Sequence, residues 1–524
     1  MGNIWIWIYF IIMVLVFLYV GYASAKKNKN EDDYATARES YPWWVIGFVI
    51  PATFASGATF MGSAGMVYGY GFPAFWYLLG YPVGGYLGMT FLGRLGTGIN
   101  KSGARTIPEF IGIRYNSGPL CVIAACISFM LFAYIGGQIV AGGTIFQVLF
   151  GVDYKIGAWI ATLVVLSYIV IGGARANIVT ATIQSAIMLV VALSAVAIFF
   201  AAPGLEGGIS ELNAKLVAID PVLGADSVFN SANMQLATGF AVAMTFFAHC
   251  PYSLLPHFGM KWASLRKPSE MPKALIMSGV IGIIFVVGAA CPALIARVTM
   301  PDLPRSDMAL VALFNTYLPP WASAFMVIGI FCAIMSTAAG LFISNAQAIA
   351  NDIYRVVLSE KCGHDAATCE KWVKIISRVA TILVAVIATI MVLNPPPYLT
   401  LFLWIGVGGV LSSTSGPVLL GLYWKGATRT AAYVTVIGCF IVYLLLVTGA
   451  VGQRWEGMPA TGLMFLVSLA VTWVVSLVTK DRMPDEYLAK LGIFKDLEHM
   501  REGSAAHKAR QSAPVTGEEA LQAN

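Results

Sequence analysis

The chain has 524 residues, of which 58% are hydrophobic and only 11% are charged. Soluble domains carry about a quarter charged residues, so this composition excludes a soluble globular protein and indicates an all-α integral membrane protein. The net charge of +6 is no sign of nucleic-acid binding, because a basic face against anionic lipid accounts for it.

Apolar runs long enough to cross a bilayer recur along the whole chain. We predict thirteen spans, at residues 4–24, 43–71, 74–93, 118–150, 156–172, 176–202, 233–256, 273–297, 320–351, 374–394, 397–424, 429–450 and 459–479. The first run has no charge before it and three lysines after it, opposite to a signal peptide. It therefore predicts a retained helix whose N-terminus lies outside.

Charge then predicts the orientation of the other spans. With the N-terminus outside, 27 of the 32 Lys and Arg residues fall in cytoplasmic segments, as the positive-inside rule requires. The protein is thus predicted to be multi-pass in the cell (inner) membrane, with a cytoplasmic C-terminus. No charged residue falls in the middle of a span, so a cation held at mid-depth would have neutral oxygen ligands. Such ligands favour a hard ion such as sodium.

The span at residues 43–71 has an unusual middle. Residues 51–59 place a proline, a glycine and three hydroxyls at bilayer depth. Proline and glycine weaken a helix, and opened backbone at that depth is tolerated only where it lines a buried cavity. This pattern predicts a broken helix whose carbonyls and hydroxyls bind a ligand. The alternative is a kinked helix whose hydroxyls bond back to its own carbonyls.

Residues 94–116 are predicted to form a cytoplasmic loop, and Gln138 follows a pair of glycines in the next span. Those glycines indicate either close helix packing or the wall of a pocket. Further on, Gly172 and Gly173 are predicted to end one helix at the cytoplasmic surface, before the next one begins.

The seventh span is also irregular, with Pro251 and Pro256 five residues apart and His249 at membrane depth. His249 is either a hydrogen-bonded packing residue or a ligand contact, and His257 is assigned a structural role. This span lies five helices after the first broken one. Interruptions in corresponding positions of two five-helix halves are typical of inverted-repeat transporters. No P-loop, HExxH motif or nucleophile elbow is present, so an enzyme is not predicted.

A further hydroxyl pair follows in the span at residues 320–351. Ser336 and Thr337 lie three and four residues after Ala333, on the same face of a helix. Packing or back-bonding of the hydroxyls is the alternative to a ligand site.

Several short motifs together resemble the sodium:solute symporter family over about residues 1–480. They are Met61–Gly65, Gly172–Gln184, Pro256-His257 with Lys261, Ala333–Thr337 with Asn351–Arg355, and Gly416-Pro417 with Tyr423–Lys425. The first broken span most resembles the pantothenate-type branch. The resemblance implies a LeuT-type inverted repeat (5+5 core helices) and sodium-coupled symport.

The family's shared sodium site uses two carbonyls at the first break and a carbonyl plus two hydroxyls on core helix 8. The resemblance therefore implies sodium ligands at Ala52, Ala55, Ala333, Ser336 and Thr337. Members that bind a second sodium have an aspartate where this chain has Ala181, and hydroxyls where it has Ala339 and Gly340. We accordingly expect one sodium ion as the only cofactor.

The substrate residues expected on the same basis are Thr59, Gln138, His249 and Tyr252. Proline carriers have an aspartate at the position of Phe54, which argues against proline. The arginine that binds the carboxylate in sialic acid carriers has no counterpart in the fourth span. We expect a small carboxylate, pantothenate or a short monocarboxylate, with a neutral or zwitterionic solute as the alternative.

The predicted organisation has four parts. Residues 1–42 form a leading helix and linker, 43–424 the transport core, 425–479 two additional helices, and 480–524 a cytoplasmic tail. The expected partners are the small-molecule substrate and the lipid bilayer, without nucleic acid; the sequence leaves the oligomeric state open. A solute sensor on the same fold is the alternative from another class, although the tail has no room for a kinase domain. A channel is a weaker alternative, because no pore filter is visible.

Overall fold

The computed structural model describes residues 4–201, 207–394, 399–452, 454–455 and 457–494. Within these ranges the protein is helical, and its only β pairing is two isolated bridges, Tyr41 with Leu265 and Thr428 with Arg482. The predicted all-α fold is therefore confirmed. Of the predicted tail at 480–524, residues 495–524 lie outside the described residues.

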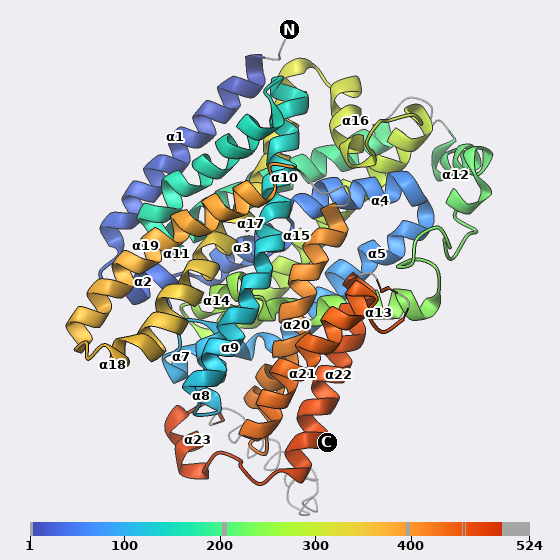
Figure 1. Ribbon diagram of the computed structural model, residues 1–524. Coiled ribbons are helices and arrows are strands. Elements are labelled where there is room, and N and C mark those ends of the chain that lie inside the picture. Colours follow the sequence, from blue (N-terminus) through green and yellow to red (C-terminus); the bar gives the residue numbers. More distant parts are fainter. Residues whose placement is uncertain (1–3, 202–206, 395–398, 453, 456, 495–524) are drawn as a thin grey trace, which may run out of the picture.

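The α-helices follow one another along the chain (Figure 1). They are α1 (Ile4–Lys27), α2 (Glu31–Thr36), α3 (Trp43–Phe54), α4 (Ser63–Tyr70), α5 (Phe75–Leu79), α6 (Gly85–Leu92), α7 (Arg94–Ser102), α8 (Ile107–Arg114), α9 (Gly118–Ser128), α10 (Phe132–Phe150), α11 (Tyr154–Ala201), α12 (Gly208–Ile219), α13 (Gly239–His249), α14 (Pro256–Ala263), α15 (Met271–Thr299), α16 (Ala309–Tyr317), α17 (Pro320–Gln347), α18 (Ser359–Lys361), α19 (Ala366–Met391), α20 (Leu399–Tyr423), α21 (Arg429–Thr448), α22 (Gly457–Val478) and α23 (Asp485–Leu491). Between them lie the π segments η1 (Ala58–Gly62), η3 (Gly80–Gly84) and η9 (Ala348–Leu358) and the 3-10 segments η2 (Phe72–Ala74), η4 (Phe129–Leu131), η5 (Pro221–Leu223), η6 (Cys250–Leu254), η7 (Pro268–Glu270) and η8 (Ser306–Met308).

The number of spans depends on how the interrupted helices are counted. In the described part of the chain, nine helices are long and apolar enough to cross a membrane, or ten if the bent pair Trp43–Phe54 and Thr59–Tyr70 is one span. The long helix α11 covers two predicted spans. The predicted spans 74–93 and 233–256 are each divided into short helices, so they do not count as single apolar helices. The predicted total of thirteen is therefore not established.

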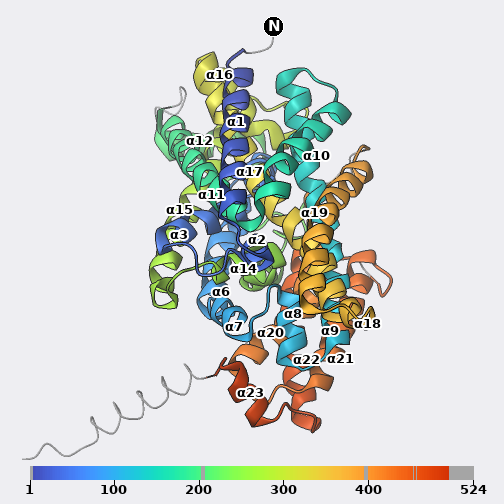
Figure 2. The same cartoon turned by 90° about the vertical axis from the view of Figure 1, so that its left-hand side faces the viewer.

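The elements are distributed between two ends of an elongated bundle. The start of α1 lies at one end together with α12 and α16, whereas α7, α8, α18 and α23 lie at the other (Figures 1 and 2). The described chain thus begins and finishes at opposite ends of the molecule.

Helix α17 occupies the centre of the bundle. Its most apolar window is entirely buried, and α1, α3, α10, α11 and α19 all pack against it. A helix surrounded on all sides is apolar all round rather than amphipathic. Small residues such as Ala333, Ser336 and Gly340 let neighbouring backbones approach closely.

Helix α1 lies along α11 at the edge of the bundle (Figure 1). Its buried positions, Ile6, Phe10, Met13, Phe17 and Gly21, recur at helical spacing, while the opposite face is exposed. A Cβ at Gly21 would lie 2.9 Å from the Tyr168 Cα atom, so glycine is what lets the two backbones meet.

The predicted loop at residues 94–116 is mostly helical, and this part of the prediction is wrong. Thr106 caps α8 by accepting a hydrogen bond from the Glu109 N–H at 3.0 Å, and the Glu109 carboxylate accepts from the Arg105 N–H at 2.8 Å. This Thr-x-x-Glu arrangement resembles a capping box and stabilises the start of a helix. The signal was present in the sequence, but the high polarity of the segment hid it.

Buried polar contacts fasten α8 to the end of the central helix. Arg355 in η9 pairs with Glu109, and the Asn351 side chain donates to the same carboxylate at 2.8 Å. Asp352, fully buried, accepts from the Thr106 hydroxyl. Buried ionic groups are tolerated when they are paired in this way, so the cluster holds α8 and η9 together at this end of the bundle.

Gly173 joins the two halves of α11 in a backbone conformation that other residues avoid. Its φ is 60° and its ψ is −148°, and a Cβ there would lie 2.5 Å from the Tyr34 carbonyl oxygen. Arg175, two residues later, pairs with Asp33 at 3.2 Å. The double glycine thus turns the chain and brings α11 against α2.

We predict that Gly173→Ala destabilises the protein by about 1–3 kcal/mol, the cost of holding a non-glycine residue in such a conformation. Thermal unfolding of the detergent-purified protein measures the change. Gly438→Ala in α21 is the matched control, because no atom lies within 4 Å of its added Cβ. Equal melting temperatures for the two variants would contradict the assigned role of Gly173.

Candidate functional site

The predicted break in the span at residues 43–71 is present. Helix α3 ends at Phe54, Ala55 has φ −80° and ψ 89°, and the second half of the span continues at an angle of 57° to the first. Pro51, inside the last turn of α3, cannot donate a backbone hydrogen bond. The break therefore frees backbone carbonyls in the interior of the bundle, where Ala52, Thr53 and Ala55 are all at most 1% exposed.

The two hydroxyls of α17 meet these carbonyls. Ser336 donates to the Ala52 carbonyl at 2.7 Å and lies 3.0 Å from the Ala333 carbonyl oxygen. Thr337 donates to the Thr53 carbonyl at 3.2 Å. All these groups are buried, so the contact joins the broken helix to the central one through oxygen atoms alone.

A second buried Ser-Thr pair shows how different this arrangement is. Ser413 and Thr414 in α20 both donate to the Val410 carbonyl of their own helix, each at 2.8 Å. Serine and threonine hydroxyls in an apolar helix commonly donate in this way to a carbonyl three or four residues earlier in the same helix. Ser336 and Thr337 instead reach across to another helix, so the back-bonding alternative does not describe them fully.

Four of the five residues expected at the sodium site thus lie together: Ala52, Ala333, Ser336 and Thr337. Ala55 is buried at the end of α3, where its N–H donates to Pro51 at 2.7 Å. Among the described contacts, none joins the Ala55 carbonyl to the α17 hydroxyls. Carbonyl and hydroxyl oxygens are suitable ligands for a hard cation, since a hydroxyl can turn its lone pairs toward an ion.

Gln138 of α10 binds the break from the other side. Its Oε1 atom accepts from the Gly57 N–H at 3.1 Å, while its Nε2 atom has no hydrogen-bond partner among the described residues. The side chain is 1% exposed. Gln138 therefore satisfies an amide that the break exposes and keeps a second donor group available in a buried place.

The other three expected substrate residues, Thr59, His249 and Tyr252, line a single small cavity of about 20 Å³. The remaining lining residues are Ser56, Tyr77, Tyr134, Leu403, Trp404 and Val407. No charged side chain is among these residues. The cavity has room for about one water molecule, so the protein is closed around this place.

Aromatic rings form much of the cavity wall. The His249 ring lies 5.2 Å from the Trp404 ring and 6.1 Å from the Tyr252 ring, and Phe54 packs behind Tyr252 at 4.6 Å. The Tyr252 and Tyr134 hydroxyls are 3.1 Å apart. These contacts hold the hydroxyl and imidazole groups in fixed directions.

The tautomer of His249 follows from its neighbour. The Nδ1 atom lies 2.8 Å from the Thr245 carbonyl oxygen, which can only accept, so Nδ1 carries the hydrogen. The Nε2 atom of a neutral imidazole is then an acceptor. His249 is therefore both a packed residue and part of the cavity wall, so the two alternatives for it do not exclude each other.

Ser56 is one of the three hydroxyls that the sequence marked in the broken span, whereas Tyr77, Tyr134 and Trp404 were not predicted as site residues. Tyr134 could have been found, because it lies four residues before Gln138 and therefore on the same face of α10. Tyr77 and Trp404 lie on α5 and α20, and nothing in their local patterns marks them. Only tertiary packing, of α20 against η6 and η1 and of α5 against α13, brings them to the cavity.

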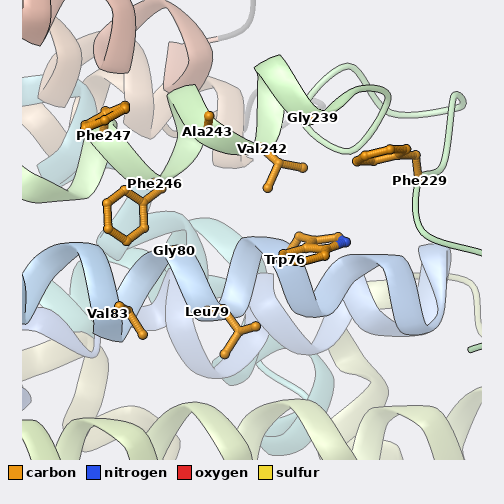
Figure 3. A pocket seen from close by; sticks show the side chains of 10 residues that line it. All are labelled: Trp76, Leu79, Gly80, Val83, Phe229, Gly239, Val242, Ala243, Phe246 and Phe247. Atoms are coloured by element: carbon orange, nitrogen blue, oxygen red, sulfur yellow. The ribbon is translucent and has the colours of Figure 1, made fainter.

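A larger cavity of about 550 Å³ lies between α5 and α13 (Figure 3). Trp76 faces Val242 across it, and the lining consists of aliphatic and aromatic side chains and two glycines. The polar atom of the Trp76 indole already donates to the Val228 carbonyl at 2.9 Å, and the other side chains of this lining have no hydrogen-bonding group for a water-soluble solute. The smaller polar cavity near the break is therefore the better candidate substrate site.

Comparisons with known proteins agree with this geometry. The family model "Sodium:solute symporter family" matches residues 34–438. The osmoregulated proline transporter OpuE of Bacillus subtilis is 26% identical over 441 residues, covering 81% of this chain and 85% of its own length. The sodium/pantothenate symporter of Escherichia coli K12 is also 26% identical, over 423 residues and 77% of this chain and 82% of its own length.

Two solved structures share the fold. A sodium-coupled sialic acid symporter in a substrate-bound outward-open state superposes with a TM-score of 0.74 at 19% identity, covering 91% of this chain and 98% of its own. MHP1, a nucleobase-cation-symport-1 family transporter in a closed conformation, superposes with a TM-score of 0.52 at 13% identity, over 88% and 97%. The predicted LeuT-type transporter fold is thus confirmed.

We predict that Gln138→Leu removes the acceptor of the Gly57 N–H and destabilises the protein by about 1–3 kcal/mol, the cost of a buried unpaired donor. Thermal unfolding measures this loss, and solute binding should weaken with it because the break borders the cavity. Gln147→Leu on the exposed side of the same helix is the control. Identical behaviour of the two variants would show that the Gln138–Gly57 contact does not support the break.

Proposed function

Because the chain belongs to the sodium:solute symporter family, we propose that it imports a small organic carboxylate together with one sodium ion. Pantothenate and short monocarboxylates are the solutes we expect. The coupling ion would bind between α3 and α17, at Ala52, Ala55, Ala333, Ser336 and Thr337. The protein acts as a carrier rather than an enzyme, and sodium is its only cofactor.

The observation that carries this proposal is the contact of Ser336 with the Ala52 carbonyl at 2.7 Å and of Thr337 with the Thr53 carbonyl at 3.2 Å. These groups converge from two helices without any carboxylate. A sodium ion placed among them would replace hydrogen bonds by coordination and hold α3 against α17.

The small volume of the polar cavity supports an alternating-access mechanism. About 20 Å³ is far too little for any organic solute. The walls that come from different parts of the chain must therefore move apart, as in transporters whose two repeats rock around a fixed central site. Thr59 on the broken span and Tyr252 on η6 belong to the two interrupted helices, which we expect to move together.

The donors in the cavity favour a carboxylate. The Ser56, Thr59, Tyr134 and Tyr252 hydroxyls that line it can all donate, and the described lining contains no acidic group that would repel an anion. Such donors can bind a carboxylate without a buried cation. The sodium/pantothenate relative fits this choice by its name.

A zwitterionic solute such as proline is the second candidate. Tyr77, Tyr134, Tyr252 and Trp404 surround the cavity, and aromatic faces attract ammonium groups. The proline transporter among the relatives fits this choice. Phe54, where proline carriers are expected to have an aspartate, packs against Tyr252 and makes us favour the anion.

The orientation belongs to the same proposal. We place the end with α7, α8, α18 and α23 in the cytoplasm and the start of α1 outside, because most basic residues then face the cytoplasm. Residues 1–42 lead into the transport core at 43–424, followed by two additional helices at 425–479 and the tail at 480–524. The membrane in this proposal is the cell (inner) membrane, which fits the bacterial source of the relatives.

Uptake into proteoliposomes tests the function. Labelled pantothenate, pyruvate, acetate and proline are offered with and without an inward sodium gradient, at two membrane potentials. One sodium moving with one monovalent anion carries no net charge, so uptake should need sodium but ignore potential. Uptake that rises with a negative interior would indicate a neutral or zwitterionic solute or a second sodium, since one charge gains about 2.3 kcal/mol per 100 mV.

Replacing both Ser336 and Thr337 by Ala should raise the sodium concentration for half-maximal uptake at least about tenfold, since even outer-shell changes at metal sites cost about 10–100-fold. Ser413→Ala with Thr414→Ala is the matched control, because those hydroxyls bond only within their own helix. Uptake that is indifferent to sodium for every solute would refute the proposed coupling.

A further inference from the structure

Lys261 lies beside the candidate sodium site, although its position in the sequence is beyond the predicted span. Its Nζ atom donates to the Thr53 hydroxyl, and the residue is 4% exposed on α14. Thr53 is the same residue whose carbonyl accepts from Thr337. The ammonium and the α17 hydroxyls therefore meet at one residue of the broken helix.

No described residue supplies this lysine with a counter-charge. None of the ion pairs among the described residues includes it. A buried ammonium is costly unless oxygen atoms surround it. The Thr53 hydroxyl supplies one such oxygen. The carbonyl of the same residue accepts from Thr337, which is one of the residues that we assign to sodium. The lysine and the ion would thus both bind next to Thr53.

A second place for the ammonium lies next to the first. Lys261 also lines a cavity of about 20 Å³ together with Asn177, His257, Gly340 and Ser344. The Asn177 Oδ1 atom and both ring nitrogens of His257 have no hydrogen-bond partner among the described residues, and the two side chains are 5% and 3% exposed. Asn177 Oδ1 and one nitrogen of neutral His257 are acceptors that an ammonium could use.

The size and position of this cavity would allow the Lys261 ammonium to enter it. A volume of about 20 Å³ holds one water-sized group, which is also the size of an ammonium head. Gly340 lies one turn beyond Thr337, and a Cβ there would contact His257 at 3.3 Å and Asn177 at 3.5 Å. Ser264 and Thr36 also line the cavity, and the Ser264 hydroxyl donates to the Thr36 carbonyl of α2 at 2.6 Å.

We propose that Lys261 is a tethered cation that competes with sodium. Without the ion, the ammonium binds Thr53 and its positive charge lies beside the sodium site. When sodium binds, the ammonium moves to Asn177 and His257. The lysine would thereby weaken sodium binding and favour release of the ion. Lys261 acts on the site as a positioning residue, and the inference rests on the proposed sodium coupling.

Equilibrium binding of radioactive sodium to the purified full-length protein, without solute, tests this. Lys261→Met should lower the half-saturating sodium concentration about tenfold, the size expected for removing a like charge a few ångströms away at a partly screened site. Lys261→Arg keeps the charge and should restore weak binding. Lys267→Met, an exposed lysine on the same side, is the control and should change nothing.

Sodium binding to the Asn177→Ala variant tests the second position of the ammonium independently. It removes an acceptor for the displaced ammonium, so sodium binding should weaken by about tenfold to a hundredfold, the effect of one lost hydrogen bond to a charged group. In the Lys261→Met background the same change should have no effect, because that variant has no ammonium that could donate to Asn177. This non-additivity would not arise if both residues served only to pack the helices.

The outcomes separate the two proposals. Wild-type protein that binds no sodium would overturn both. Sodium binding to the wild type with unchanged or weaker affinity in folded Lys261→Met overturns the competition alone. Lys261→Gln is the second neutral variant if the methionine variant does not fold, and melting curves report on folding in each case. Additive effects of Lys261→Met and Asn177→Ala would also overturn the second position of the ammonium.

Discussion

The structure depends on one contact, between the opened backbone of α3 and the hydroxyls of α17. Carbonyls freed inside a membrane protein need partners, because neither lipid nor bulk water supplies them. Ser336 and Thr337 supply donors from the most buried helix of the bundle, at 2.7 Å and 3.2 Å. The same oxygens are the ligands that a hard cation prefers, so stability of the break and ion binding use one set of atoms.

This contact also connects the ion to the solute. The break follows Phe54, directly after the Ala52 and Thr53 carbonyls, and its far end lines the polar cavity with Ser56 and Thr59. Gln138 fixes the middle of the break through Gly57 at 3.1 Å. An ion that orders the first residues of the break would therefore help to order the last ones, which is a direct physical basis for coupling between two sites.

Sequence predicted those parts of the molecule that depend on local chemistry. Pro51 and Gly57 marked the break, and the spacing of Ala333, Ser336 and Thr337 placed them on one face of a helix. Trp404 and Tyr77 were missed because periodicity tells which face of a helix is apolar, not which distant helix it meets. Lys261 was placed outside the membrane by its position in the chain, yet its long side chain reaches back to Thr53.

Saturable binding of sodium to the purified protein tests the central claim most directly, because it needs no knowledge of the solute. The account predicts one sodium ion per chain, lost when Ser336 and Thr337 are both replaced by alanine. It predicts unchanged binding when Ser413 and Thr414 are replaced instead. Saturable binding that survives the loss of Ser336 and Thr337, or the absence of saturable binding in the wild type, would contradict it.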